Sequence, residues 1–411
     1  MRLLVSCIPY DGGKSGISVY VREVVAALAA QGHSLTLLVE PGEEKSLAFA
    51  TIANRQPTTC PTTLSPQPST LNSQPSTHSA PAWTRRAVCS MLWHLFILPF
   101  WIRRHRSEFD GFVICAANRR VCAWYPLPTV ATIHDLANFH IPGKYSRLRM
   151  FYLAHILPFF AKRAQHLVAV SGATKADMVK YWHCRPDDVT VLYNGLQGVS
   201  GKVEKWKGGK VEEGEVISPT QDSQLSTLNS QLSTILYISR IEHPGKNHVR
   251  LIEAYGTLPR TLAEAHPLVI AGADWKDAAV VHEAAAKSPH ADLIRFTGFV
   301  PSADMEKLWA AAGFYVFPSL FEGFGLSLIE AMARGVPSAC SGNGSLGEIA
   351  ADVALTFNPE SVEEIAEALE RLLTERAEDR AARIARGREH VKKFSWPDHA
   401  KGITKLLEGA A

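Results

Sequence analysis

Short apolar runs of strand length alternate with segments of helical period along most of this sequence. The first run is 2–8, and the next is 35–39. Between them, four apolar residues share one helical face: Ile17, Val21, Val24 and Leu28. Gly32 is placed to end that helix. This alternation is typical of parallel sheets with crossover helices, and it predicts an α/β fold.

The alternation continues to about residue 340. Further strands are predicted at 112–115, 129–133, 167–170, 189–192, 235–238, 268–270, 294–296, 314–317 and 336–340. A chain of 411 residues is too long for one core, because single cores stop growing at about 250–300 residues. We therefore predict two Rossmann-like parallel-sheet domains that face a central cleft.

Two stretches interrupt this pattern. Residues 56–82 and 199–233 are rich in Ser, Thr, Gln and Pro, and both contain the hexapeptide Ser-Thr-Leu-Asn-Ser-Gln. Such segments bury little apolar surface, so both are predicted to be disordered insertions. The predicted divisions are a first domain, a linker, a second domain and a last helix, over 1–198, 199–233, 234–395 and 396–411.

Composition favours a globular enzyme in a reducing compartment. The formal net charge is only +3, so nothing demands nucleic acid. Seven scattered cysteines without a CxxC pair indicate neither a disulfide framework nor a zinc site. The N-terminus does not have the pattern of a signal peptide. We expect a cytoplasmic protein without a metal or other cofactor.

Residues 88–102 form an apolar segment flanked by arginines. This segment is too short to span a bilayer, which needs about 20 residues. It is interpreted either as a buried helix with solvated ends or as an interfacial helix on an anionic membrane. The second interpretation would place the protein at the inner face of the cytoplasmic membrane.

Glycines follow the first predicted strand. Residues 11–16 contain Gly12, Gly13 and Gly16 directly before a helix. Such a loop forms either a plain tight turn or a place where backbone amides approach an anion. The spacing is not the GxGxxG of a dinucleotide site, which argues against an NAD-dependent dehydrogenase.

Two carboxylates bracket a glycine-rich turn near the end of the strand at 314–317. Glu322 precedes the helix that follows this turn, and Glu330 lies about one turn into it. Both are placed to accept hydrogen bonds from sugar hydroxyls, unless they are ordinary acids at a helix start. Gly335 is placed to end the helix.

Two cations follow the strand at 235–238. Arg240 and Lys246 leave the carboxyl end of this strand, where open α/β sheets bind their ligands. Two cations in this position suit a diphosphate, although charged residues in a loop are also common surface features.

Together these residues resemble the retaining glycosyltransferases of family 4, also called group 1, which have the GT-B fold. The similarity is continuous over 235–358 and looser over the first half. Its motifs there include 12–16, 132–135, 169–171 and 193–195. The sequence departs from the family pattern at Ser239, Ser327, Gly347 and Leu196-Gln197.

The resemblance implies that 1–198 is the acceptor-side domain, that 234–395 binds the nucleotide sugar, and that the last helix, 396–411, returns to the first domain. It also implies a role for each matched residue. Arg240 and Lys246 would hold the donor diphosphate, Glu322 and His134 would contact the sugar, and Glu330 would bind the ribose. Backbone amides would place the sugar at Phe324, Gly325 and Leu326. Gly298, Phe299 and Val300 would lie near the base, and Gly13 and Gly16 would close over the phosphates. His134 and Asp135 are alternatively a general base pair, but adjacent residues on a strand point to opposite faces.

The implied activity is transfer of a mannose- or glucose-type sugar from a UDP- or GDP-sugar to a glycan or lipid-linked acceptor, in polysaccharide or glycoconjugate synthesis. The family mechanism is a front-face substitution without metal. The alternatives are a sugar-nucleotide epimerase of the same fold and a catalytically silent nucleotide-sugar-binding protein.

Overall fold

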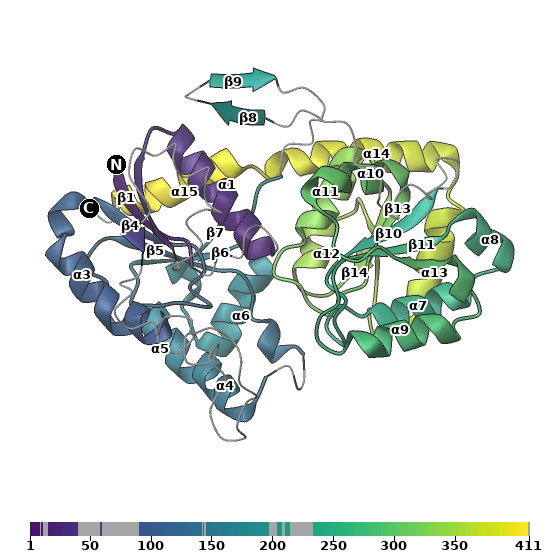
Figure 1. Cartoon of the computed structure of the whole chain (residues 1–411), viewed down its shortest axis with the longest axis horizontal. Coiled ribbons are helices and arrows are strands. Elements are labelled where there is room, and N and C mark those ends of the chain that lie inside the picture. Colours follow the sequence, from purple (N-terminus) through teal and green to yellow (C-terminus); the bar gives the residue numbers. More distant parts are fainter. Residues whose placement is uncertain are drawn as a thin grey trace, which may run out of the picture.

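Two parallel sheets organise the chain in the computed structural model (Figure 1). The structure describes residues 1–8, 10, 15–39, 58–59, 90–141, 143, 145–196, 204–207, 210–213 and 233–409. We call the unit built on the seven-stranded sheet the first domain and the unit built on the six-stranded sheet the second domain. This arrangement confirms the predicted pair of Rossmann-like domains.

The sheet of the first domain has the order β3-β2-β1-β4-β5-β6-β7, with every pair parallel. Its strands are β1 (Arg2–Ser6), β2 (Ser34–Val39), β3 (Thr58–Thr59), β4 (Gly111–Ile114), β5 (Thr129–Ile133), β6 (His166–Ala169) and β7 (Val189–Val191). The helices are α1 (Gly16–Ala30), α3 (Leu98–Arg104), α4 (Arg147–Phe151), α5 (Leu157–Ala161) and α6 (Gly172–Trp182).

Successive residues of a strand in this sheet enter different cores. Leu3 and Val5 pack in the cluster that contains the apolar side of α1, whereas Leu4 packs in the cluster that contains Leu98 of α3. This follows from the two-residue period of a strand, and it leaves both faces of the sheet covered by helices. A parallel sheet requires this arrangement.

The sheet of the second domain has the order β12-β11-β10-β13-β14-β15 and is also parallel. Its strands are β10 (Thr234–Ile238), β11 (Leu268–Ala271), β12 (Ile294–Phe296), β13 (Ala312–Phe317), β14 (Ser338–Ser341) and β15 (Leu355–Phe357). The helices are α7 (His248–Gly256), α8 (Arg260–Ala265), α9 (Ala278–Lys287), α10 (Ser302–Ala311), α11 (Leu326–Arg334), α12 (Gly344–Ala350), α13 (Val362–Leu373) and α14 (Ala377–His390).

The last helix, α15 (Trp396–Gly409), packs on α1 of the first domain, as predicted. The Tyr20 hydroxyl lies 2.9 Å from Nε2 of His399, and the rings of Tyr20 and Trp396 meet edge to face at 5.7 Å. Gly195 lies against the start of this helix, where a Cβ atom would be 2.2 Å from the Trp396 nitrogen. The end of the chain therefore joins the two domains.

Only short pieces of the two predicted insertions are described. They are β3, which pairs with β2, and the antiparallel hairpin of β8 (Glu204–Lys207) and β9 (Lys210–Glu213). Ser233, which precedes β10, is described as well. The rest of 56–82 and 199–233 lies outside the described residues, so their disorder and the exact domain divisions stay predictions. The sequence pattern did not predict β3, β8, β9 or β15.

Candidate active site

The switch point of the second sheet brings two loops together. β10 and β13 are neighbours, but the chain continues from β10 toward β11 and from β13 toward β14, on opposite sides. Ligands of open α/β sheets bind in the crevice that this divergence leaves at the carboxyl ends of the strands. The loop after β10 carries Arg240 and Lys246, and the loop after β13 carries Glu322.

Lys246 and Glu322 form an ion pair in this crevice. Nζ of Lys246 lies 2.6 Å from Oε1 of Glu322, and the two side chains are 20% and 18% exposed. The next residue, Asn247, fixes the loop because its side-chain amide donates to the carbonyls of Pro318 and Pro359 at 3.0 and 2.7 Å. The lysine is therefore held in place, and its Nζ has two further protons for a ligand.

Arg240 stands apart from this pair. Its Nη2 lies 3.4 Å from Oε2 of Glu242, and its guanidinium lies 5.2 Å from the centre of the Trp275 ring. About half of the side chain is exposed. The structure thus places both predicted cations on one loop, with Lys246 anchored and Arg240 at the open rim.

The turn before α11 presents backbone amides. Gly325 precedes the helix with φ +108°, a conformation that favours glycine, and a Cβ atom there would lie 2.6 Å from Leu346. Among the described residues, no acceptor is found for the N–H groups of Phe324, Gly325 or Leu326. Free amides at a helix N-terminus attract anions and hydroxyl oxygens. Gly335 ends α11 with φ +72°, as predicted.

Glu330 lies one turn into α11. Burial raises the pKa of its carboxyl to about 7, and the neighbouring Arg334 opposes this shift. Arg22 of α1, in the first domain, also lowers the pKa of Glu330, so its positive charge lies near this carboxyl across the domain boundary. A carboxyl that titrates near neutral pH is a candidate for a functional group.

The loop after β12 contains Gly298, Phe299 and Val300. Gly298 has φ +68°, and its carbonyl accepts a hydrogen bond from the Gly272 nitrogen at 2.9 Å. This turn leaves the Phe299 side chain 58% exposed, whereas Val300 is buried. Phe299 is thus available to stack on an aromatic ligand.

His134 follows β5 in the first domain and is buried. Its Nε2 lies 2.7 Å from the Cys115 carbonyl, and its ring meets Tyr20 edge to face. A carbonyl only accepts hydrogen bonds, so Nε2 carries the proton. Burial lowers the pKa of His134, so the ring is neutral at pH 7 and its Nδ1 is an acceptor. Asp135 instead accepts a hydrogen bond from the Ala137 nitrogen on Oδ1 at 3.1 Å. Among the described residues, no hydrogen bond joins Asp135 to the His134 ring.

Gly16 opens α1, where the Ser15 hydroxyl accepts from the Ser18 nitrogen. A Cβ atom on Gly16 would meet no atom of the described residues within 4 Å, so this part of the structure leaves room at the start of the helix. Gly13 lies outside the described residues, and its predicted contact with phosphate stays a prediction.

Contacts between the domains surround the site, and they could not be predicted from the sequence pattern. The Gly323 carbonyl accepts hydrogen bonds from the hydroxyls of Ser171 and Thr174. Glu348 of the second domain accepts from the Gly172 and Ala173 nitrogens, both at 2.9 Å, and so caps α6 of the first domain. It also accepts from the Tyr193 hydroxyl at 2.7 Å. The sequence signal for Glu348 was only its place in the family motif.

Two departures from the family pattern have local partners. The hydroxyl of the buried Tyr315 donates to Ser327 Oγ at 2.6 Å, which satisfies a polar group inside the second domain. Gly347 lies so close to the Gly342 carbonyl that a Cβ atom would be 2.4 Å from its oxygen. At Gly347 this chain therefore has room for glycine alone.

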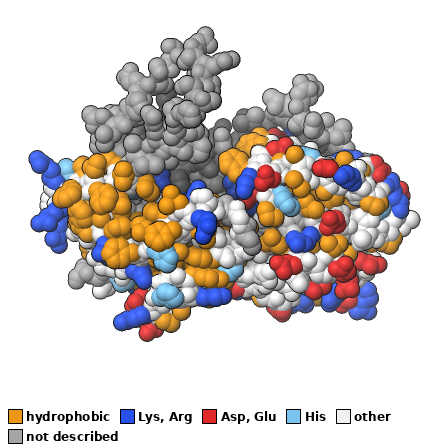
Figure 2. Space-filling model, turned by 90° about the horizontal axis from the view of Figure 1, so that it is seen from below, with side chains coloured by type: hydrophobic (Ala, Val, Ile, Leu, Met, Phe, Trp, Pro, Cys, Tyr) orange, Lys and Arg blue, Asp and Glu red, His pale blue; other side chains and the backbone are white. Residues whose placement is uncertain are grey.

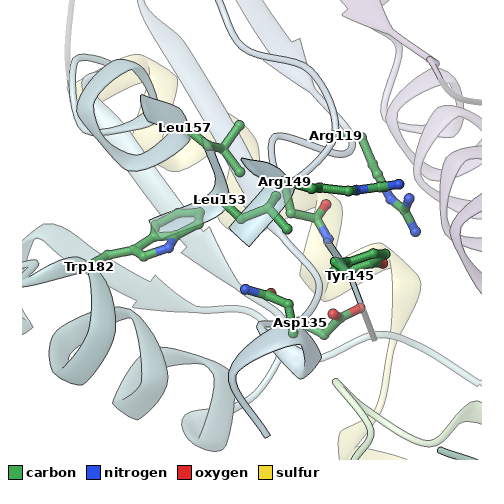
Figure 3. A pocket seen from close by; sticks show the side chains of 9 residues that line it. Arg119, Asp135, Tyr145, Arg149, Leu153, Leu157 and Trp182 are labelled. Atoms are coloured by element: carbon green, nitrogen blue, oxygen red, sulfur yellow. The ribbon is translucent and has the colours of Figure 1, made fainter. Parts of the chain in front are cut away.

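A pocket lies in the first domain, and Asp135, the residue after His134, is one of the side chains that line it (Figure 3). Arg119, Arg149 and Asp135 bring charge to it, and the Arg149 guanidinium lies 4.1 Å from the centre of the Tyr145 ring. The other lining residues are Asn118, Asn138, Leu153, Leu157 and Trp182. With two arginines and one aspartate, the pocket has an excess of positive charge and suits an anionic group.

The two domains, their joining helix and the crevice at β10 and β13 define a glycosyltransferase of the GT-B fold. The Glycosyltransferase Family 4 profile matches residues 14–197, and the profile for Glycosyl transferases group 1 matches 220–390. The chain belongs to this family of retaining glycosyltransferases.

Several proteins of similar sequence are named as hexose transferases or polysaccharide synthases. The O-antigen chain mannosyltransferase B of Escherichia coli is 30% identical over 268 residues, which are 65% of this chain and 66% of that protein. The serotype-specific mannosyltransferase WbdA of Escherichia coli is 30% identical over 298 residues, 69% of this chain but only 34% of WbdA. The glycogen synthase of Mycobacterium tuberculosis is 26% identical, over 70% of this chain and 64% of the synthase.

Solved structures share the fold. A sucrose-phosphate synthase from Thermosynechococcus elongatus superposes with a TM-score of 0.69 at 17% identity, over 100% of this chain and 99% of the synthase. HepE of Anabaena, solved with UDP and glucose, superposes with a TM-score of 0.66 at 17% identity, over 99% of both chains.

No helix in the described part of the chain is long and apolar enough to cross a membrane. No group of three or more His, Cys, Asp or Glu side chains in that part of the chain is arranged to hold a metal ion.

Proposed function

We propose that this protein transfers a mannose- or glucose-type sugar from a nucleoside diphosphate donor to a glycan or lipid-linked acceptor, with retention at the anomeric carbon. The Lys246–Glu322 pair beside the free amides of α11 carries this proposal, because it joins a phosphate-binding cation to a sugar-binding carboxylate. The named relatives support a hexose donor and a polysaccharide product.

The donor is assigned along the crevice of the second domain. Lys246 and Arg240 bind the diphosphate, and Glu322 accepts hydrogen bonds from the sugar hydroxyls. The amides of 324–326 place the sugar. Glu330 binds the ribose, and the base lies against the Gly298–Val300 loop, with Phe299 stacked on it. His134 receives a sugar hydroxyl on Nδ1, and Gly13 and Gly16 close over the phosphates from the first domain.

The proposed reaction needs no base from the protein. The acceptor hydroxyl attacks the anomeric carbon on the face from which the diphosphate leaves, and the bond from that carbon to the phosphate oxygen breaks. The proton of the hydroxyl passes to an oxygen of the departing phosphate. Preorganised cations lower the barrier because they stabilise the negative charge that develops there. The lowered pKa of the buried His134 makes its Nδ1 a weak base, which favours positioning of the sugar over proton transfer.

The acceptor is assigned to the first domain, in the pocket that Arg119 and Arg149 line. Its excess positive charge suits an acceptor that carries a phosphate. We place the reaction in the cytoplasm at the inner face of the membrane, where lipid-linked acceptors are accessible.

Ligand-dependent thermal unfolding of the full chain tests the donor site. A nucleotide present at 100 times its dissociation constant should stabilise the protein by about 2.7 kcal/mol. We expect a shift of the unfolding temperature with UDP or GDP and none with NAD. No shift with either nucleotide at millimolar concentration would contradict the donor site.

Analysis of the reaction products then distinguishes a transferase from an epimerase and from a catalytically silent protein. A transferase forms a glycosylated acceptor and free nucleotide, whereas an epimerase returns an altered nucleotide sugar without an acceptor. Binding without either product would identify a catalytically silent protein.

The pH dependence of nucleotide binding tests Glu330. Because burial raises the pKa of Glu330 to about 7, this carboxyl is mostly protonated at pH 6 and mostly ionised at pH 8. The carboxylate is the stronger acceptor for ribose hydroxyls, so its contribution to affinity should rise as the pH rises through 7. We expect the affinity ratio of wild type to Glu330→Gln to increase by up to about tenfold between these pH values, by calorimetry.

The ionisation of the nucleotide itself is the same for both proteins and cancels in this ratio.

The stability of the protein without ligand gives a second test of Glu330. Since the pKa of Glu330 is raised above 4.5 by folding, its contribution to stability falls as the pH rises from about 4.5 through 7, and Glu330→Gln should remove that fall. A ratio that is independent of pH would argue against the ribose assignment.

A further inference from the structure

The first domain exposes a cluster of large apolar side chains. Of the ten large apolar side chains that are exposed among the described residues, seven lie between 92 and 159. They are Leu92, Phe96, Ile97, Phe100, Leu148, Phe151 and Phe159, and we call them the apolar face. Figure 2 shows apolar side chains gathered over this part of the molecule. Single exposed apolar residues are ordinary, but a cluster marks an interaction site.

The helices under the apolar face are firmly packed on their other side. In the helical segment 90–104, Leu92, Phe96 and Phe100 recur every four residues on the outer side, whereas Leu98 and Ile102 are buried in the core. Phe100 is 64% exposed. The apolar face is thus the outer side of ordered helices and not part of a loosened core.

The helical segments 90–104 and 147–161, which carry the apolar face, form one continuous surface. Residues 123–125 lie between them, because the Ala123 nitrogen donates to the Leu95 carbonyl at 2.8 Å and the Tyr125 hydroxyl donates to the Phe160 carbonyl at 3.2 Å. The ring of Trp124 in this bridge meets Phe100 edge to face at 4.6 Å. The bridge is itself aromatic, so it extends the apolar surface.

Positive charge surrounds the apolar face. Residues 90–107 and 145–163 contain no Asp or Glu. In the described part of the chain, no carboxylate forms an ion pair with the basic side chains on these segments, which are Arg103, Arg104, Arg106, Arg147, Arg149, Lys162 and Arg163. The Arg163 guanidinium lies 4.0 Å from the centre of the exposed Phe159 ring. Apolar side chains beside unpaired arginines are what an anionic bilayer attracts.

We propose that the apolar face docks on an anionic lipid bilayer. Its Leu, Ile and Phe side chains enter the boundary between headgroups and acyl chains, and the arginines contact lipid phosphates. A second copy of the chain is a poorer partner, because two-fold pairing would bring the same arginines against each other. The charge around the face thus selects the lipid surface.

Docking of the apolar face would also bring the proposed acceptor pocket close to the bilayer. In 147–161, the side that carries Leu148 and Phe151 faces outward, while Arg149, Leu153 and Leu157 line the pocket (Figure 3). This step rests on the proposed transfer to a lipid-linked acceptor. An acceptor that is anchored in the docked bilayer would then reach the two arginines of the pocket around a single helix.

Vesicle cosedimentation of the full chain tests the docking. We expect binding to vesicles of phosphatidylglycerol and phosphatidylcholine that weakens with added salt, and little binding to phosphatidylcholine alone. The double variant Phe100→Glu/Leu148→Glu should bind at least about tenfold more weakly, because each lost apolar side chain is worth that much or more. Arg103→Gln/Arg104→Gln should lose about fivefold per arginine.

Val280→Glu is the matched control, since Val280 is an exposed apolar residue on α9 of the second domain and should not affect binding. Three results would overturn the proposal: no binding to anionic vesicles, equal binding by Phe100→Glu/Leu148→Glu, or a dimer in ultracentrifugation that this variant abolishes. The nucleotide-induced thermal shift, measured on the same variants, should be unchanged. Its absence in the wild type would contradict the transferase and leave the docking result standing.

Discussion

Replacing Lys246 with alanine is expected to lower kcat/KM for sugar transfer by about 10² or more, the usual effect of losing one group that stabilises charge in a transition state. Nζ of Lys246 is fixed 2.6 Å from Glu322 at the carboxyl end of β10, where the diphosphate is assigned. The substitution removes a cation that interacts most strongly as the phosphate leaves, so kcat should fall along with affinity. Steady-state kinetics with a nucleotide sugar measures both.

Lys287→Ala is the matched control. Nζ of Lys287 is also 2.6 Å from a carboxylate, that of Glu283, but this pair is on the exposed surface of α9 and its loss should change nothing. The double variant Lys246→Ala/Glu322→Gln tests whether the loss comes only from leaving Glu322 without its partner. If the double variant recovers near-normal turnover, or if Lys246→Ala never loses it, the assignment of Lys246 is wrong. Arg240→Ala should show a loss of similar size.

The positions of most strands along the chain could be predicted because a parallel sheet buries most strand residues. The run 129–133 matches β5 without error, and all of its residues are buried. The edge strand β12 matches its predicted bounds as well, although none of its residues is buried. β3 is two threonines and β15 has a threonine at its centre, so neither has a continuous apolar run. The turns around α11 could be predicted as well, because Gly325 and Gly335 adopt backbone conformations that favour glycine.

The contacts between the domains could not be predicted from the residues alone. Glu348 caps α6 from a position 176 residues further along the chain, and such pairing depends on how the two finished sheets pack. The apolar face is an intermediate case. The sequence left 88–102 as either a buried or an interfacial helix, and in the described part of this segment one side is buried while the other is exposed. The contribution of α4 and α5 to that face came from the tertiary structure.

Replacing Gly323 with alanine is expected to lower kcat by roughly 10², since a misplacement of about 1 Å in an active site has effects of this size. Gly323 of the second domain lies directly against the first domain, where its Cβ atom would be 2.0 Å from the His134 carbonyl oxygen and 2.9 Å from Cβ of Asp135. Both contacts are with backbone or the base of a side chain, so the domains themselves must move apart. The neighbouring Glu322 would move with the loop.

Gly342→Ala is the control for this substitution, because its Cβ atom would lie 3.6 Å from the nearest atom, an ordinary contact. Nucleotide affinity separates closure from folding. Apart from Gly13 and Gly16, the groups assigned to the nucleotide lie on the second domain, so the nucleotide-induced thermal shift of Gly323→Ala should stay near that of the wild type while turnover falls. If turnover also stays normal, the contact of Gly323 with His134 is not needed for the reaction, and the sugar transfer does not require the domains to approach as closely as they do here. If both are lost, Gly323 serves the fold of the donor site itself.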